Sequence, residues 1–242
     1  MTGHLHPLTI LTDKIYQFFK PYGFEIVHGP EIVTPVDNFD SLNIPPDHPA
    51  RKGFDTFYLK DGRTLRAHMT ALYYRAMKDR HPPVRLLFPG RCFRNESTDA
   101  THNMIFHQMD VLVIDEKTNL GNLIATLQDL MKHLVGPDLE FRIRSSYFPF
   151  TEPSIELDIS HKRASKSPSL SSFDIKRPGG DWLEMLGAGM VNPNVIKYYG
   201  LDPEKYQGLA VGMGLERILN VSCGVDDVRY TLSGDYRYLG QY

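Results

Sequence analysis

The chain has 242 residues, of which 41% are hydrophobic and 23% charged, and its formal net charge is −2. These values are ordinary for a soluble globular protein and exclude a globally basic nucleic-acid-binding protein, so any nucleic-acid contact needs a local patch or a partner. The two cysteines, Cys92 and Cys223, form neither a disulfide framework nor a metal-ligand spacing. No apolar run approaches the roughly 18 residues of a membrane span, and the N-terminus lacks a signal-peptide pattern. We therefore expect a cytoplasmic protein with no membrane contact.

The N-terminal third predicts an amphipathic helix followed by short elements. Apolar residues between Leu8 and Lys20 share one helical face, and Pro21 and Gly23 end that helix. Thr70 is expected to cap a second helix. In chain order, this third predicts a helix over 8–20, strands over 24–27 and 31–36, a proline-rich loop over 43–53, a hairpin over 57–67 and a helix over 70–79.

The rest of the chain predicts strands around one long helix. Apolar residues from Leu120 to Leu134 form a continuous stripe, which we interpret as core contact rather than a cofactor site. Alternation of apolar and polar residues indicates antiparallel strands. The elements expected are strands over 84–88 and 106–114, a helix over 118–134, strands over 139–143, 155–159, 182–186 and 209–211, and a helix over 213–221. Because strands outnumber helices without βαβ alternation, we expect an α+β fold with a large antiparallel sheet flanked by helices.

Residues 160–180 differ from the rest of the chain in composition. They are rich in serine and contain five Lys/Arg and one Asp, a net charge of +4 by that count. This composition favours a solvated loop between two strands. The alternative is a contact with a nucleic-acid backbone or a partner.

Two distant segments carry the residues of a nucleotide site. The stretch 90–106 contains Arg94, which can fork onto phosphate oxygens, Glu96, which can accept from an exocyclic amine, and Phe106, which can stack on a purine. The second segment, 212–217, reads Gly-Met-Gly-Leu-Glu-Arg, and its glycines let the backbone approach a ligand closely. Together they indicate a site that binds a polyphosphate and a flat base.

These segments resemble motif 2 and motif 3 of the class II aminoacyl-tRNA synthetases, and the resemblance is closest to the α subunits of the bacterial phenylalanyl-tRNA synthetases. It covers nearly the whole chain, and the further matching stretches are 3–7, 38–45, 47–51, 147–153, 182–191 and 238–242. The resemblance implies one class II catalytic domain over 1–242, with 160–180 as an insertion. It also implies ATP-dependent activation of phenylalanine, transfer to tRNA, a need for Mg²⁺, a β subunit in a heterotetramer, and a subunit interface at the motif 1-like segment Gly29-Pro30.

The resemblance assigns Arg94 to the α-phosphate and the attacking carboxylate, and Arg217 to the γ-phosphate, as the two catalytic residues. Because the amino acid's carboxylate is already an anion, the reaction needs alignment and charge neutralisation rather than a nucleophilic side chain. His102 would reach the β- and γ-phosphates. The implied ATP-binding set is Arg94, Glu96, His102, Phe106, Glu184, Gly212, Gly214 and Arg217, and the implied magnesium ligands are Glu152 and Glu184.

The implied amino-acid pocket encloses an aromatic side chain and holds an ammonium group. Phe148 and Phe150 would pack edge-to-face on the substrate ring, and the small Ala210 would leave room for it. Asp110 would pair with the ammonium. The residues expected to contact the amino-acid backbone are His68, Thr70 and Gln108.

The chain departs from the family pattern at several positions. Met69-Thr70 follows His68 where Thr-Ser is usual, which is reminiscent of phosphoseryl-tRNA synthetase, but an acid at 110 and rings at 148 and 150 disfavour a phosphorylated substrate. Asp110-Val111 occupies positions where Glu-Gly is usual in the family. Val211 replaces the usual phenylalanine, which removes a ring beside the pocket. The family's α subunits usually begin with a helical arm, whereas this sequence starts at the catalytic core, as either a truncated or a naturally short form.

Two alternatives remain open beside a phenylalanine–tRNA ligase subunit. One is a stand-alone paralogue that adenylates an aromatic amino acid without charging tRNA, which the absent arm suggests. The other is a non-catalytic regulatory module of the same fold. The second is disfavoured because Arg94, Glu96, Phe106 and Arg217 are all present.

Overall fold

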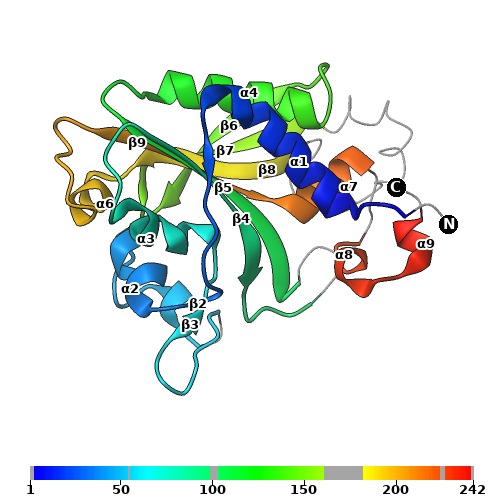
Figure 1. Cartoon of the computed structure of the whole chain (residues 1–242), viewed down its shortest axis with the longest axis horizontal. Helices are drawn as coiled ribbons and strands as arrows, with labels where there is room; N and C mark the ends of the chain where they lie inside the picture. Colours follow the sequence, from blue (N-terminus) through cyan, green and yellow to red (C-terminus); the bar gives the residue numbers. More distant parts are fainter. Residues whose placement is uncertain (1–2, 54, 99–102, 161–181, 224–226, 241–242) are drawn as a thin grey trace.

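A computed structural model of the chain describes residues 3–53, 55–98, 103–160, 182–223 and 227–240 (Figure 1). At its centre is a seven-stranded sheet in the order β1-β4-β5-β9-β8-β7-β6. All neighbouring strands are antiparallel except β1, which runs parallel to β4 at the edge. The prediction of an α+β fold with a large antiparallel sheet is confirmed, with one parallel edge strand added to it.

The strands of the central sheet are mostly long and close to their predicted positions. They are β1 (Glu25–Ile26), β4 (Val84–Phe93), β5 (Ile105–Asp115), β6 (Phe141–Phe148), β7 (Thr151–Ser160), β8 (Trp182–Val191) and β9 (Gln207–Gly214). A separate pair consists of β2 (Ile32–Val33) and β3 (Thr64–Leu65).

The two long helices begin at caps that the sequence provides. In α1 (Pro7–Phe19) the side chain of His6 accepts from the Leu8 N–H, and Pro7 occupies the first turn. In α4 (Leu120–Leu134) the side chain of Asn119 accepts from the Asn122 N–H. The shorter helices are α2 (Pro35–Asn38), α3 (Tyr73–Met77), α6 (Pro193–Tyr198), α7 (Leu215–Cys223), α8 (Tyr230–Ser233) and α9 (Tyr236–Leu239), and a 3-10 turn, η4, spans Met69–Leu72.

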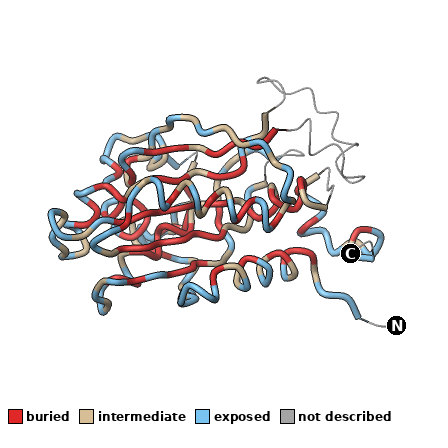
Figure 2. Tube along the Cα trace, turned by 90° about the horizontal axis from the view of Figure 1, so that it is seen from above, coloured by how far each residue is buried: buried red, intermediate tan, exposed pale blue. Residues whose placement is uncertain are grey.

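The sheet separates two hydrophobic clusters, because successive side chains of a strand point to opposite faces. On one face, Val111 and Val211 pack with the apolar stripes of α1, α4 and α7. On the other, Leu112 and Ala210 pack with η4, α3 and α6. Figure 2 shows the buried residues along the strands and on one side of the helices.

Three predicted elements differ from the structure. The strand expected over 31–36 is shortened to β2, because Thr34 and Asp37 form a capping box that starts α2. The hairpin expected over 57–67 forms, with Leu59 bonded to Arg63 and Leu65 to Phe57 on either side of the Tyr58–Thr64 bridge, but only its second arm is a strand, β3, which also pairs with β2. Thr70 caps no helix, because it lies inside η4 and its hydroxyl donates to Asp110.

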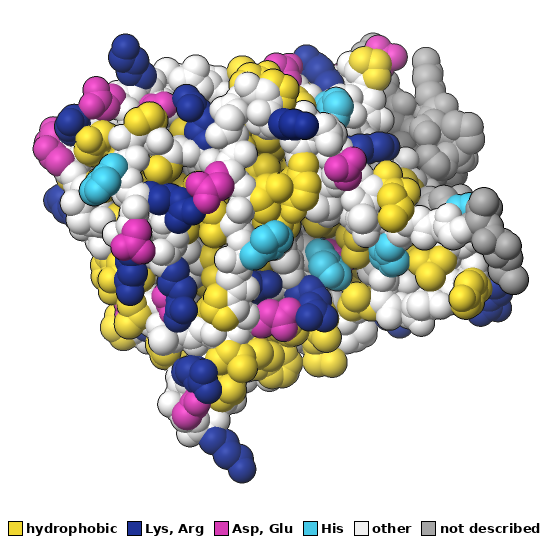
Figure 3. Space-filling view, viewed as in Figure 1, with side chains coloured by type: hydrophobic (Ala, Val, Ile, Leu, Met, Phe, Trp, Pro, Cys, Tyr) yellow, Lys and Arg dark blue, Asp and Glu magenta, His cyan; other side chains and the backbone are white. Residues whose placement is uncertain are grey.

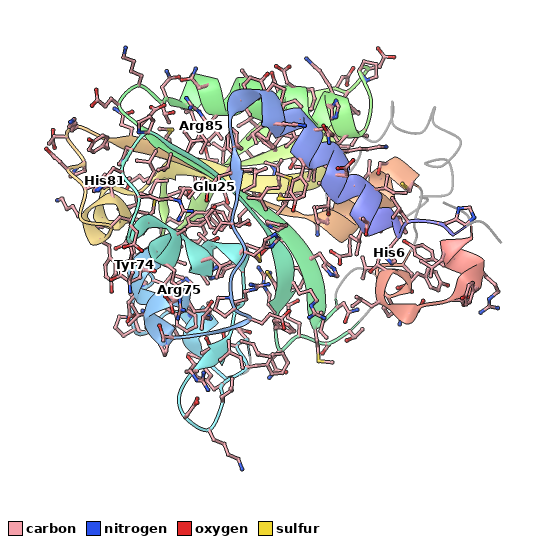
Figure 4. The ribbon with its side chains drawn as sticks, viewed as in Figure 1. His6, Glu25, Tyr74, Arg75, His81 and Arg85 are labelled. Atoms are coloured by element: carbon pink, nitrogen blue, oxygen red, sulfur yellow. The ribbon has the colours of Figure 1, made fainter. Side chains whose placement is uncertain are left out.

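Ion pairs and hydrogen bonds attach the peripheral elements. Arg75 of α3 pairs with Asp37 of α2 at 2.8 Å (Figure 4). His6 joins the start of α1 to the C-terminal helices through the Thr231 carbonyl at 3.1 Å. Charges of both signs are intermixed on the face shown in Figure 3. Within the described residues, no helix is both long and apolar enough to span a bilayer.

Candidate active site

A cavity of about 840 Å³ collects nearly every residue that the sequence singled out. Fourteen of the predicted residues line it: His68, Thr70, Arg94, Glu96, Phe106, Gln108, Asp110, Phe148, Phe150, Glu184, Ala210, Gly212, Gly214 and Arg217. Such a large cavity, with apolar walls and a few convergent polar groups, is typical of a small-molecule site.

The pairing of β5 with β9 brings the two distant segments together. Asp110 lies opposite Gly212, and Gln108 lies opposite Gly214. A Cβ at Gly212 would come within 3.3 Å of the Asp110 carboxylate, so the glycine keeps this part of the cavity open. The chain leaves β4 and β9 at the end of the sheet where β5 begins, so Arg94, just after β4, and Arg217, just after β9, reach the same cavity.

The two arginines have partly exposed side chains with few competing partners in the described structure. The Nε of Arg94 donates to the Ala67 carbonyl at 3.1 Å, and its guanidinium carbon lies 4.9 Å from the ring centre of Phe106. Its Nη1 lies 4.0 Å from Glu96. The Nη1 of Arg217 donates to the backbone and side chain of Glu184 at 3.2 and 3.4 Å. Such weak, half-exposed pairs are easily exchanged for phosphate oxygens.

Asp110 is a buried carboxylate with one oxygen left without a partner. Its Oδ2 accepts from the hydroxyls of Thr70 and Tyr73 at 2.7 and 3.3 Å, whereas its Oδ1 is buried with no hydrogen bond to any residue that the structure describes. Burial raises the pKa of Asp110 to about 7, although the two hydroxyls and the Arg94 guanidinium act in the opposite direction. A buried acceptor that lacks a donor is costly, so this oxygen is suited to a cationic ligand.

His68 and Gln108 lie beside Asp110 in the same cavity. Burial, with a smaller effect from the Arg94 guanidinium, lowers the pKa of His68 to about 3, so the imidazole is neutral. Its Nδ1 is buried without a hydrogen-bond partner in the described part of the chain. The Oε1 of Gln108 accepts from the Met69 N–H at 3.3 Å, which leaves its amide nitrogen on the side of Gly212. These groups give the cavity further hydrogen-bonding positions for a polar ligand.

Two phenylalanines form an apolar wall. The rings of Phe148 and Phe150 are stacked, with centres 5.8 Å apart and an interplanar angle of 15°. The turn between them is held by Asn43, whose amide donates to the Pro149 carbonyl at 2.9 Å. A Cβ at Gly187 would lie 2.8 Å from the Phe148 ring, so this glycine makes the position of the ring possible.

A shift of register in β8 directs Glu184 into the cavity. Leu157 pairs with Leu186, but the next residue of β7, Asp158, pairs with Glu184 instead of Met185. The extra residue places Met185 and Leu186 together in the core below the sheet. Glu184 therefore shares the cavity side of the sheet with Glu156, as expected of a bulge that redirects a side chain.

Comparisons with known proteins agree with this geometry. The family model for the core domain of class II tRNA synthetases (F) matches residues 1–242. The chain belongs to this class II synthetase family.

The relatives of this synthetase core include phenylalanine–tRNA ligase alpha subunits. The subunit from Acaryochloris marina is 44% identical over 99% of this chain and 67% of its own length. That of Legionella pneumophila is 45% identical over 100% of this chain and 70% of its own. The chain thus spans about two thirds of the length of these relatives.

A solved synthetase structure has the same fold. It is the pyrrolysyl-tRNA synthetase from Desulfitobacterium hafniense, with a TM-score of 0.71 over 96% of this chain and 75% of that one. At 20% identity, this similarity supports the class II fold alone.

Two predicted residues are not brought into the cavity. His102 lies outside the described residues. Glu152 is exposed and is not part of the lining; its carboxylate accepts from Asn192 at 3.3 Å. The prediction that Glu152 and Glu184 share a site therefore has no support in the geometry, because the adjacent Thr151 points inward and Glu152 does not.

The cavity also contains acidic residues that the sequence did not single out. Glu156 lines it together with Glu184, and so does Glu216 of α7, which accepts from the His107 backbone and ring. Within the described residues, no group of three or more His, Cys, Asp or Glu side chains could hold a metal. One or two carboxylates suit a Mg²⁺ ion held mainly by phosphates, and Glu156 and Glu184 fit that requirement.

Val211 does not have the position that the comparison with the family suggested. Its side chain packs into the cluster beneath α1 and α4, opposite to Ala210 and Asp110. Only a backbone contribution is then expected on the cavity side, because neighbouring residues of a strand alternate. The missing ring therefore affects the support behind the pocket rather than its lining.

Proposed function

We propose that this chain is the catalytic α subunit of a phenylalanine–tRNA ligase, which activates phenylalanine with ATP and transfers it to tRNA. The observation that carries the proposal is one cavity that holds Arg94, Arg217 and the unpartnered oxygen of Asp110 beside two phenylalanine rings. We treat residues 1–242 as one catalytic domain, in line with the family match over that range.

The amino acid is held at its ammonium group and at its ring in this proposal. Its ammonium donates to Oδ1 of Asp110, where it meets an acceptor without a partner. Its ring lies against Phe148 and Phe150, above the small residues Ala210 and Gly187. Among the described lining residues the only Lys or Arg are Arg94 and Arg217, which we assign to the phosphates, so an aromatic side chain is favoured over an acidic or phosphorylated one.

ATP binds between the two arginines. Phe106 stacks on adenine and Glu96 accepts from its amine, while Arg94 exchanges its contact with Glu96 for the α-phosphate. Arg217 releases Glu184 and pairs with the far phosphates. His102 remains a proposed contact of these phosphates, outside the described residues.

The chemical step needs charge neutralisation at phosphorus, and the substrate itself supplies the nucleophile. The phenylalanine carboxylate attacks the α-phosphorus, the bond to the bridging oxygen breaks, and pyrophosphate leaves. Arg94 stabilises the charge that develops on the α-phosphoryl oxygens. Mg²⁺ would neutralise the pyrophosphate, and Glu156 and Glu184 are the residues positioned to hold it.

The partners follow from the family and remain proposals. The relatives are named alpha subunits, so we propose a β subunit in a heterotetramer, with tRNA as the acceptor and the cytoplasm as the location. The exposed apolar residues Ile26, Ile32 and Val36 lie near Gly29-Pro30, where we expect the subunit interface.

Pyrophosphate exchange into ATP tests the function directly. We expect exchange with phenylalanine above the other amino acids, and charging of tRNA when the β subunit is co-expressed. Exchange without charging in the presence of β would favour the stand-alone paralogue. No exchange with any amino acid, from a folded protein that binds ATP, would refute the proposal.

A further inference from the structure

A row of paired charges lies at the edge of the cavity on β6, β7 and β8. Arg144 lies opposite Glu156, Arg142 lies opposite Asp158, and Asp158 lies opposite Glu184. Glu156 and Glu184 line the cavity, whereas Arg142, Arg144 and Asp158 are not part of its described lining. The row thus places arginines beside the two acidic residues, on the same face of the sheet.

Arg144 contacts three carboxylates at once. Its Nη2 lies 2.6 Å from Glu156 and 3.8 Å from Glu184, and its Nε lies 2.7 Å from Asp158. The other oxygen of Glu184, Oε1, is the one that accepts from Arg217 at 3.4 Å. The other oxygen of Glu156 accepts from Ser146 at 2.8 Å. Arg144 is therefore connected to Arg217 through a single shared carboxylate.

Asp158 anchors this arginine from the buried side. Its side chain is 1% exposed, and it accepts from both Arg142 and Arg144. Burial acts to raise the pKa of Asp158, but the hydrogen bonds from Arg144 and Arg142 outweigh it and hold the pKa below its usual value. Asp158 is therefore ionised at neutral pH and keeps Arg144 in place.

We infer that Arg144 is a positioning residue that holds the carboxylates of Glu156 and Glu184 in the geometry required for Mg·ATP. This inference rests on the proposed function. Two carboxylates that face a polyphosphate repel it and each other, so a cation beside them is needed to fix and partly neutralise them. The same contact determines how firmly Glu184 retains Arg217 before ATP arrives.

Arg142 provides a matched control, because it also pairs with Asp158 but does not contact Glu156 or Glu184 in the described structure. It donates to Asp158 at 2.6 and 2.9 Å, and its guanidinium lies 4.8 Å from the centre of the Trp182 ring. Its described ion pair is with Asp158 and not with Glu156 or Glu184. Replacing either arginine leaves Asp158 with one cation, so the two variants differ in their effect on the cavity.

The test compares Arg144→Gln with Arg142→Gln in the whole α subunit, with its β subunit where one is required. Calorimetry with a non-hydrolysable Mg·ATP analogue measures nucleotide binding without catalysis. Loss of an outer partner of a metal ligand costs about 10- to 100-fold in affinity, and we expect that loss in Arg144→Gln only. Phenylalanine affinity should stay at the wild-type value in both variants, which shows that the cavity is intact.

Two further measurements separate positioning from simple support of the fold. The Mg²⁺ concentration that half-saturates pyrophosphate exchange should rise in Arg144→Gln, and Arg144→Lys should restore part of the loss because it keeps the charge. In a double-mutant cycle, Arg144→Gln should have little effect on nucleotide affinity when Glu184 is already Gln.

Equal losses of Mg·ATP affinity in Arg144→Gln and Arg142→Gln, or unchanged affinity in Arg144→Gln, would overturn the inference. Additive effects in the cycle would also count against it. These results differ from failure of the proposed function, in which wild-type protein binds the Mg·ATP analogue but exchanges pyrophosphate with no amino acid.

Discussion

The free carboxylate oxygen of Asp110 makes a quantitative prediction about stability. In the folded protein, burial raises the pKa of Asp110 from the ordinary 3.8 to about 7. A carboxyl group with a raised pKa favours folding below its unfolded pKa, and this contribution is lost as the pH rises through the folded value. At about 1.36 kcal/mol per pKa unit, the charged form destabilises the ligand-free protein by at most about 4 kcal/mol above pH 7.

Asp110→Asn removes this cost and keeps an acceptor for the hydroxyls of Thr70 and Tyr73. Urea unfolding should show that the variant is more stable than wild type, with a gap that grows by roughly 2–3 kcal/mol between about pH 5 and about pH 8. Asp129→Asn is the control, because that side chain is 68% exposed and should show no such gap.

The same substitution should weaken phenylalanine binding. Truncating one partner of a buried charge pair costs about 2–5 kcal/mol, so we expect the Kd to rise at least about 25-fold. In wild type, affinity should fall as the pH drops below about 7, because a protonated Asp110 no longer attracts an ammonium. A stability gap that does not change with pH, or normal phenylalanine binding by Asp110→Asn, would refute the reasoning.

Three further substitutions test separate parts of the cavity. Arg94→Ala should lower the rate of exchange about 10²- to 10³-fold with little change in Tm, since its side chain is partly exposed and makes one backbone contact; near-normal exchange would exclude its role. Gly187→Ala should raise the KM for phenylalanine and leave that for ATP unchanged, because the new Cβ would lie 2.8 Å from the Phe148 ring. Tyr199→Phe should be neutral or stabilise by about 1 kcal/mol, since its hydroxyl is buried without a partner; a clear loss in urea unfolding would contradict this.

The elements that could be predicted from sequence are those whose signal is local. The stripe of α4 predicts its length to within two residues, because an amphipathic helix repeats its pattern over four turns. The strands β4 and β5 were likewise predicted from local apolar residues, although β4 (Val84–Phe93) continues beyond the predicted end at Phe88. Thr70 shows the limit: as a local signal it favours a helix cap, but a carboxylate 40 residues away, on Asp110, takes its hydroxyl.

The residues of the candidate site also fall into those that a local motif predicts and those that depend on strand pairing. Arg94 and Arg217 were identified because each lies in a recognisable motif, and β5–β9 pairing brings them to the same cavity. Glu156 carries no motif, although the alternation over 155–159 already places it on the polar side of its strand. Glu184 reaches the cavity through a register shift at Met185, which no period-2 pattern predicts.

The unpaired atoms of the cavity explain why these features belong together. Asp110 Oδ1 and His68 Nδ1 are both buried without partners among the described residues, and each costs stability in the absence of a ligand. The rings of Phe148 and Phe150 and the weak ion pairs of Arg94 and Arg217 likewise leave interactions that a ligand can improve. A substrate that brings an ammonium, a ring and phosphates satisfies these groups together, so binding energy that would otherwise be spent on ordering the site is available for the transition state. The stability gained by Asp110→Asn and the affinity lost in the same variant should therefore have one physical origin, the desolvated negative charge.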